Sequence, residues 1–187
     1  MYGDLVICSD DASRLVEAAA PLASNETLRR KHRLAGLRKV LQEHTYQHRL
    51  SYVAENVFGR GLNRQLPHIT VLARPSTQDE LRLILAAFKR QEWSSKNLVL
   101  ALVPGLELAD EWSREITVLS LHQAESRQVA SLPRVDGGLA AFHPDDYYAA
   151  TYLTDLAPGL SFSAGAPVGE ACYYTYAGEK PELRAQG

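Results

Sequence analysis

The sequence predicts an open, mostly parallel α/β sheet that follows an N-terminal helical segment. From residue 67 onward, short apolar runs typical of buried strands alternate with helix-type spacing. Residues 69–102 have the length of one strand–helix–strand unit, whose parallel strands are joined by a right-handed crossover. Residues 1–66 instead show helical spacing over most of their length. We therefore expect a strand and helical segment in residues 1–66 and an α/β domain in residues 67–187.

The first part of the chain carries one strand-type run followed by helix-type patterns. Residues 5–8 predict a short buried strand, with Cys8 as a buried free thiol. Residues 9–11 cap a helix that we expect to end near Pro21, and Asn25 opens a longer helix. The predicted inward stripe of that second helix consists of Leu34, Leu37 and Leu41.

The second part of the chain predicts four strands and a helix between the first two. The strands cover residues 68–73, 98–103, 116–121 and 139–142. Thr77 and Glu80 stand at the spacing of a capping box, and apolar residues at helical spacing follow them. Those apolar residues are Leu81, Ile84, Leu85 and Phe88. Gly137 and Gly138 allow a tight entry to the last strand.

Two adjacent carboxylates follow the fourth strand, in a turn that also contains a histidine. Asp145 and Asp146, together with His143, are suited to hold a divalent cation against phosphate oxygens. Acidic residues are also favoured at helix N-termini, so the same pair can cap a helix that includes Tyr148 and ends at Pro158. The residue types by themselves leave both interpretations open.

The turns after the first and fourth strands are the places where a sheet of this kind binds ligands. Open α/β sheets hold their ligands beyond the carboxyl ends of the strands. Arg74 lies in the turn after the first strand, and the acidic turn follows the fourth. Arg74 and the acidic turn can therefore face one crevice.

The residues around the acidic turn resemble a known enzyme family. Residues 142–156 read Phe-His-Pro-Asp-Asp-Tyr-Tyr-Ala-Ala-Thr-Tyr-Leu-Thr-Asp-Leu, and residues 168–176 read Val-Gly-Glu-Ala-Cys-Tyr-Tyr-Thr-Tyr. Together they resemble the acidic motif, the following helix and the tyrosine-rich strand of bacterial family 2 glycosyltransferases. The resemblance implies the GT-A fold of that family, whose sheet is open and Rossmann-like. It also implies a nucleotide-sugar partner and a divalent metal, Mn²⁺ or Mg²⁺, as cofactor.

The same resemblance assigns roles to particular residues. In the family, the first and third positions of the acidic motif bind the metal and the nucleotide diphosphate. Those positions are His143 and Asp145 in this chain, with Asp146 adjacent. Residues 69–102 resemble the family's first strand–helix–strand unit, in which Arg74 belongs to the nucleotide-binding turn. A histidine supplies no negative charge, so we expect weaker metal binding than an acidic residue would give.

Two other segments bear on the comparison with glycosyltransferases. The family's aspartate that contacts the nucleotide base has no counterpart directly after the second strand, where Glu107 and Asp110 are the candidates. Residues 43–49 read Glu-His-Thr-Tyr-Gln-His-Arg and resemble the C-terminal tail of bacterial group 1, CgeB-like glycosyltransferases. The whole chain therefore resembles a junction between the tail of one glycosyltransferase module and the start of another.

The composition and net charge of the chain narrow the range of partners and cellular locations. The net charge of −2 argues against nucleic acid as the main partner. The N-terminal residues lack the basic start and apolar core of a signal peptide, and no apolar run is long enough to span a bilayer. We therefore expect a cytoplasmic protein without a membrane span. His68 and Thr70 match one of the two motifs of 2H phosphoesterases, and the other histidines do not supply the second.

These observations predict a glycosyltransferase-like protein that binds a nucleotide-sugar with a divalent metal and can transfer the sugar. The alternative is a non-catalytic or repurposed relative that acts as a binding or partner subunit, or carries out other chemistry in the same cleft. No residue stands out as the catalytic base, because the chain beyond Asp146 is short. A second copy or another protein can complete the site, since a half-built sheet leaves an exposed edge.

Overall fold

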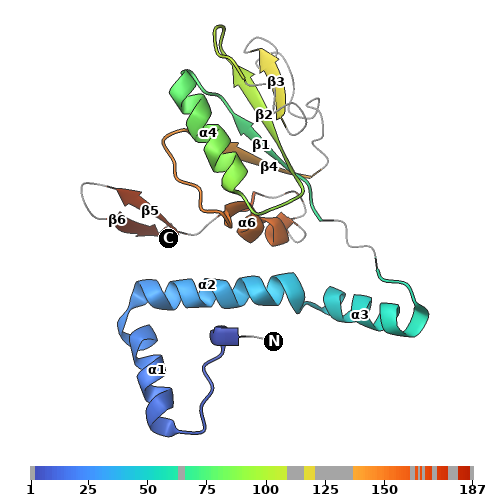
Figure 1. Ribbon diagram of the computed structural model, residues 1–187, viewed down its shortest axis with the longest axis vertical. Helices are drawn as coiled ribbons and strands as arrows, with labels where there is room; N and C mark the ends of the chain where they lie inside the picture. Colours follow the sequence, from blue (N-terminus) through green and yellow to red (C-terminus); the bar gives the residue numbers. More distant parts are fainter. Residues whose placement is uncertain are drawn as a thin grey trace. The chain divides into compact units, whose positions relative to one another are not determined.

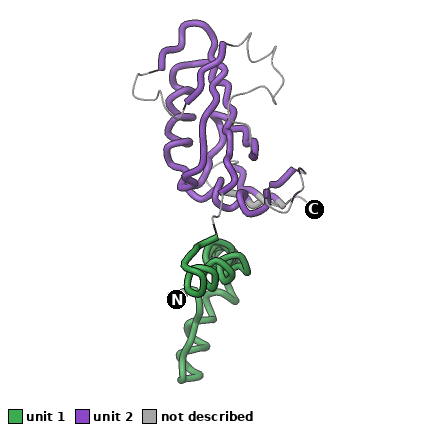
Figure 2. Tube along the Cα trace, turned by 90° about the vertical axis from the view of Figure 1, so that its right-hand side faces the viewer, with its two compact units in different colours: residues 1–64 green, residues 65–187 purple. Residues whose placement is uncertain are grey.

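The protein consists of two compact units, residues 1–64 and residues 65–187, which Figure 2 colours separately. The computed structural model describes the following residues: 3–62, 66–108, 116–120, 137–160, 163, 165, 167–169, 172–176 and 181–185. No helix among these residues is both long enough and apolar enough to cross a membrane.

The first unit is helical. It contains the short 3₁₀-helix η1 (Gly3–Leu5) and the α-helices α1 (Ala12–Ser24), α2 (Glu26–Glu43) and α3 (Tyr46–Phe58). Asp11 caps α1, because its carboxylate accepts hydrogen bonds from the backbone N–H groups of Ser13 and Arg14. The Asn25 side chain caps α2 by accepting from the N–H of Leu28 at 3.0 Å. The predicted helical segment is therefore confirmed.

Four predictions for this unit are wrong. Residues 6–8 form no strand, because no described strand lies beside them to complete a ladder, and Cys8 is exposed rather than buried. Helix α1 continues through Pro21 to Ser24. The stripe that includes Leu37 does not face inward, since Leu37 is 52% exposed and no described residue of α1, α2 or α3 is buried.

The second unit is built on a four-stranded parallel sheet, which Figure 1 shows with α4 lying across one face. Its strands are β1 (Ile69–Ala73), β2 (Lys96–Leu102), β3 (Ile116–Ser120) and β4 (Gly138–Phe142), in the spatial order β3-β2-β1-β4. All three strand pairs are parallel. This mixed α/β architecture, with a helical segment before a parallel Rossmann-like sheet, confirms the predicted fold class. A separate antiparallel pair, β5 (Cys172–Tyr176) and β6 (Pro181–Ala185), was not predicted as a sheet.

Helix α4 (Gln78–Arg90) connects β1 to β2 as the sequence predicts. Thr77 Oγ1 accepts a hydrogen bond from the Glu80 N–H at 3.2 Å, while the Glu80 carboxylate accepts from the Ser76 N–H at 2.7 Å. The apolar face of α4 is buried, and its buried residues are Leu81, Ile84, Ala87 and Phe88. Acidic residues in the first turn and basic residues in the last turn complement the helix dipole.

The core lies between the sheet and two helices, α4 and α6 (Tyr152–Leu160). Alternate residues of a strand point to one face, so Val71 of β1 and Leu100 of β2 lie on the face that packs against α4. Leu153 and Ala157 of α6 join the same cluster and are fully buried. Each large apolar side chain buried there contributes about 1.5–3 kcal/mol to folding.

The segment after β4 differs from its prediction. The helix begins at Tyr152 rather than near Tyr148, and Pro158 lies inside it instead of ending it. Asp145 and Asp146 lie in a turn well before the helix, so the interpretation that they cap this helix is wrong. The entry to β4 is as tight as predicted, because a Cβ on Gly137 would overlap the carbonyl oxygen of His68.

Candidate functional site

The acidic turn leaves the carboxyl end of β4 and is open to solvent. The N–H of Asp146 donates to the carbonyl oxygen of His143 at 3.2 Å, which closes the turn. The side chains of His143 and Asp145 are 65% and 87% exposed, and His143 Nδ1 lies 3.7 Å from Asp145 Oδ2. The carboxylate of Asp145 is therefore accessible to a ligand without any rearrangement of the backbone.

The buried side chain of Tyr148 holds the acidic turn in place. The sequence did not predict this role. Its ring stacks on Phe142 with 4.0 Å between the ring centroids, and the residue is 8% exposed. Its hydroxyl accepts from the N–H of His143 at 2.8 Å and lies 3.2 Å from Asp146 Oδ2, to which it can donate. One tyrosine thus holds both ends of the acidic turn. The pattern of a strand-ending aromatic and a second aromatic six residues later is the sequence signal that carries this contact.

The surroundings of Tyr148 keep its hydroxyl protonated. The pKa of Tyr148 is raised from 10.0 to about 12, mainly by burial of the hydroxyl and also by the negative charge of Asp146. The hydrogen bond from the His143 N–H acts in the opposite direction and lowers it. The hydroxyl therefore remains a donor toward Asp146 throughout the physiological pH range.

The C-terminal end of α4 holds the chain that follows the acidic turn. Gln91 is 3% exposed and uses both ends of its amide, because Nε2 donates to the carbonyl of Ala149 and Oε1 accepts from the N–H of Leu153. The Arg90 guanidinium donates to the carbonyl of Tyr148 at 3.1 Å. These hydrogen bonds explain why the segment between the turn and α6 is not helical, since its peptide groups bond to α4 instead.

Arg74 and the acidic turn lie at neighbouring strand ends. Strands β1 and β4 are adjacent and parallel, and their register pairs Ala73 with Phe142. Arg74 and His143 are the next residues along each strand, so both leave the same edge of the sheet. Arg74 is exposed, and its guanidinium forms no hydrogen bond or ion pair within the described part of the chain. The parallel pairing therefore brings these two predicted site residues to one end of the sheet.

The side-chain atoms at the acidic turn suit a cation that is also coordinated by ligands from outside the protein. Among the described residues, no three side chains of the His, Cys, Asp and Glu types are grouped closely enough to form a metal cage. Asp145 and Asp146 supply carboxylate oxygens, and Mg²⁺ commonly binds through one or two carboxylates with substrate phosphates and water completing its coordination. The turn therefore fits a metal–diphosphate complex better than a metal bound by protein side chains alone.

The candidates for contact with a nucleotide base lie near this edge or outside the described residues. Glu107 follows β2 and is exposed, and its backbone is held by Gln78, whose Nε2 donates to the Glu107 carbonyl at 3.0 Å. Gln78 is the first residue of α4, directly beyond the Arg74 turn. Asp110 lies outside the described residues.

His68 and Thr70, which match one motif of the 2H phosphoesterases, form hydrogen bonds within the sheet. Thr70 is fully buried, and its hydroxyl donates to Asn97 Oδ1 at 2.8 Å. The same amide oxygen lies 2.7 Å from His68 Nε2. These three residues join β1 to β2 at the amino end of the sheet, away from the acidic turn.

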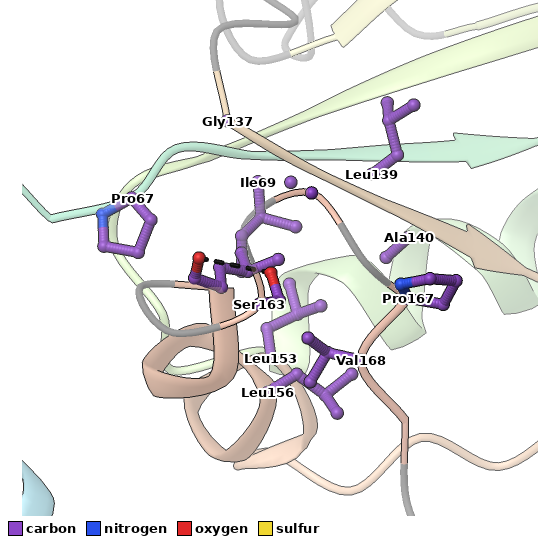
Figure 3. Close-up of a pocket in the computed structure, with 13 residues that line it drawn as sticks. Pro67, Ile69, Gly137, Leu139, Ala140, Leu153, Leu156, Ser163, Pro167 and Val168 are labelled. Atoms are coloured by element: carbon purple, nitrogen blue, oxygen red, sulfur yellow. Dashed lines mark hydrogen bonds between the residues drawn. The ribbon is translucent and has the colours of Figure 1, made fainter.

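A cavity of about 470 Å³ lies at the other end of β4 from the acidic turn. Figure 3 shows its described walls, which come from the start of β4, from α6, from Pro67 and Ile69, and from Ser163, Gly165, Pro167 and Val168. None of the site residues predicted from the sequence lines this cavity. The protein thus offers two distinct places for a ligand, one at each end of its edge strand.

By its fold and its acidic turn, the protein contains an open parallel α/β unit that carries charged groups at the carboxyl edge of its sheet. A family model described as glycosyl transferase-like matches residues 2–55, which is less than a third of the chain and lies in the helical unit. The N-terminal part of the chain is therefore glycosyltransferase-like. No curated protein and no solved structure matches the chain. The family 2 resemblance of the α/β unit stays a prediction, because the matched segment ends before that unit begins.

Proposed function

We propose that the carboxyl edge of the parallel sheet binds the diphosphate of a nucleotide-sugar together with a divalent cation, Mg²⁺ or Mn²⁺. The observation that carries the proposal is the pairing of Ala73 with Phe142, from which Arg74 and the acidic turn leave side by side. A cationic guanidinium and accessible carboxylates at one strand edge are the two kinds of group that a metal–diphosphate complex requires. The glycosyl transferase-like match in residues 2–55 supports the choice of donor class.

Each residue of the proposed site has a separate task. Arg74 can donate two parallel hydrogen bonds to phosphate oxygens, since its guanidinium is not engaged by described residues. Asp145 is the main carboxylate for the cation, because its side chain is 87% exposed and, unlike Asp146, it has no hydroxyl partner among the described residues. Asp146 is oriented by Tyr148, and His143 adds an imidazole beside Asp145. The cation would supply positive charge against the diphosphate leaving group.

Glycosyl transfer is the reaction that such binding serves in the family the chain resembles. The transfer also needs a base that removes the proton of the acceptor hydroxyl. The groups that converge at the described edge of the sheet are suited to bind phosphate and metal, and none of them is assigned as the base. Donor binding without turnover is therefore the second candidate, in which this chain acts as a binding subunit for a partner that completes the site.

The proposal is tested by thermal melting of the whole chain with UDP-, GDP- and dTDP-sugars, each with and without Mn²⁺. A ligand that binds only the folded state at a hundred times its Kd stabilises the protein by about 2.7 kcal/mol. We expect such a metal-dependent rise in Tm with one donor, and we expect Asp145→Asn and Arg74→Gln to abolish it.

Asp10→Asn and Arg60→Gln are the matched controls, because they make the same chemical changes at exposed positions of the helical unit. Both controls should keep the full rise in Tm. The absence of any shift in the folded wild type, or an equal shift in the variants and their controls, would rule out donor binding at this edge. If a shift occurs, detection of free nucleotide diphosphate in the presence of candidate acceptors separates transfer from binding alone.

A further inference from the structure

We propose that the cavity between β4 and α6 binds the hydrocarbon chain of an uncharged ligand. The cavity lies at the amino end of β4, away from the acidic turn, so this site is independent of the proposed donor site. Its volume of about 470 Å³ falls within the range of about 300–1,000 Å³ that is typical of small-molecule pockets.

The walls of the cavity determine the chemical class of the ligand. Among the described residues, no charged side chain lines it, and the side chains that point into it in Figure 3 include Ile69, Leu153, Leu156 and Val168. Ser163 is the one described lining residue with a polar side chain, and its hydroxyl already donates to the carbonyl of Leu160 at 3.3 Å. A charged ligand would lose its hydration without compensation there, whereas an alkyl chain gains free energy for each methylene that it buries.

The cavity exists because small residues of β4 face long side chains of α6. Ala140 leaves space along the strand, while the Leu160 side chain already packs against Gly138, so α6 cannot move closer there. Two contacts hold the helix where it is, since a Cβ on Gly138 would overlap a methyl group of Leu160 and a Cβ on Gly159 would overlap a methyl group of Val168. Because these groups are already in contact, the walls cannot move closer together, and the cavity persists as a feature of the fold.

The size of the cavity sets the length of the chain that it holds. If each heavy atom takes about 30 Å³, including the space between atoms, the cavity accommodates about fifteen heavy atoms. A straight chain of about ten carbons with one polar atom fits within that volume. Shorter chains would leave part of the apolar wall unpaired and bind more weakly.

The sheet edge offers hydrogen-bonding groups for a neutral head group. Strand β4 lies at the edge of the sheet, and the N–H of Gly138 donates to the His68 carbonyl of the neighbouring β1 segment. The peptide groups of the next residue, Leu139, therefore face away from β1 at the rim of the cavity. Leu139 is 45% exposed, so a hydroxyl at the end of the ligand can reach these groups from solvent.

The test is isothermal titration calorimetry of the full chain with 1-decanol, with sodium decanoate as the charged analogue. We expect 1-decanol to bind and decanoate to bind at least about tenfold more weakly, because the carboxylate must be partly desolvated. Ala140→Met extends a side chain into the cavity and displaces about three chain atoms, which should weaken decanol binding by about tenfold or more.

Ala141→Met is the matched control, because Ala141 is the next residue of β4, points to the other face and is exposed. It should leave the affinity for decanol unchanged. Val168→Met narrows the cavity from the opposite wall and replaces Ala140→Met if that variant melts at a much lower temperature. A wild type that binds no decanol, binding that survives both filling variants, or decanoate binding as strong as decanol binding would overturn the proposal. None of these results depends on whether a nucleotide-sugar binds at the acidic turn.

Discussion

Tyr148 shows how much of the candidate site depends on one side chain that never needs to touch the ligand. Its buried hydroxyl holds the backbone of His143 and lies within hydrogen-bonding distance of the Asp146 carboxylate. Its ring packs against Phe142, the last residue of the strand from which the turn leaves. Core packing therefore determines the geometry of the acidic turn, including the positions of its exposed residues.

The raised pKa of Tyr148 makes stability sensitive to alkaline pH. Below pH 10 the hydroxyl is protonated in both the folded and the unfolded chain. Between a pKa of 10.0 in the unfolded chain and a pKa of about 12 in the folded one, only the folded state keeps the proton. The free energy of unfolding should therefore fall as pH rises through this window.

Tyr148→Phe removes this pH dependence and the hydrogen bonds of the hydroxyl. At pH 8 we expect the variant to lose about 1–2 kcal/mol of stability in urea denaturation. The gap between wild type and variant should narrow as pH rises above 10. Tyr147→Phe is the control, since Tyr147 is 76% exposed and Phe retains the ring on which the Arg90 guanidinium lies. A gap that stays constant up to pH 11 would show that the Tyr148 hydroxyl does not titrate as proposed.

At the scale of elements, the end of α4 decides where α6 begins. The amide of Gln91 and the N–H of Glu92 bond to peptide groups of residues 149–153, which lie far along the chain. Helical spacing in the sequence suggested a continuous helix from Tyr148, and this side-chain contact overrides that local preference. The acidic turn is consequently separated from the helix that it was expected to cap.

Gln91→Met keeps the length of the side chain and removes its hydrogen bonds. The variant leaves the N–H of Leu153 unpaired in a buried setting and removes one of the two hydrogen bonds to the carbonyl of Ala149, which keeps its bond from the Tyr152 N–H, so it should lose about 2 kcal/mol of stability. The measurement is the midpoint of urea unfolding. Gln47→Met, at an exposed position of α3, should shift stability by less than about 0.5 kcal/mol. Equal midpoints for the two variants would show that the Gln91 contacts contribute nothing to the fold.

At the scale of the whole molecule, the two units differ in how they are stabilised. The hydrophobic core consists of residues between 69 and 157, all in the second unit. In the first unit, no described helical residue is buried, and large apolar side chains such as Leu50, Val53 and Val57 are half or more exposed. Helices of that length have little stability in water without tertiary packing. The first unit therefore lacks a core of its own among the described residues.

This difference predicts distinct behaviour of the two units when each is produced alone. Residues 65–187 should unfold in urea as one cooperative transition, monitored by circular dichroism. Residues 1–64 should lose helical signal gradually, without a sigmoidal transition, at a protein concentration low enough to exclude association. A sharp transition in residues 1–64 under those conditions would show that the helical unit folds independently.

The sequence by itself determined the parts of the protein that depend on local pattern and chain geometry. A capping residue was enough to predict the start of α2, and capping residues with apolar spacing were enough to predict α4, because cap bonds and amphipathic faces are local properties. The length of the β1–α4–β2 unit was enough to predict that β1 and β2 pair in parallel, since a right-handed crossover is strongly preferred. The alternation of strands and helices also placed Arg74 and the acidic turn after strands of one sheet.

Tertiary structure decided what local pattern leaves open. Residues 5–8 have the composition of a strand but no described partner strand, and a strand is stable only within a ladder. The order β3-β2-β1-β4 made β1 and β4 neighbours, and that adjacency is what brings Arg74 beside the acidic turn. The contacts of Gln91 and the cavity beside β4 arise between segments distant in sequence, and the role of Tyr148 depends on burial of its ring against Phe142. Their packing energy depends on which surfaces meet, and only the folded chain specifies that.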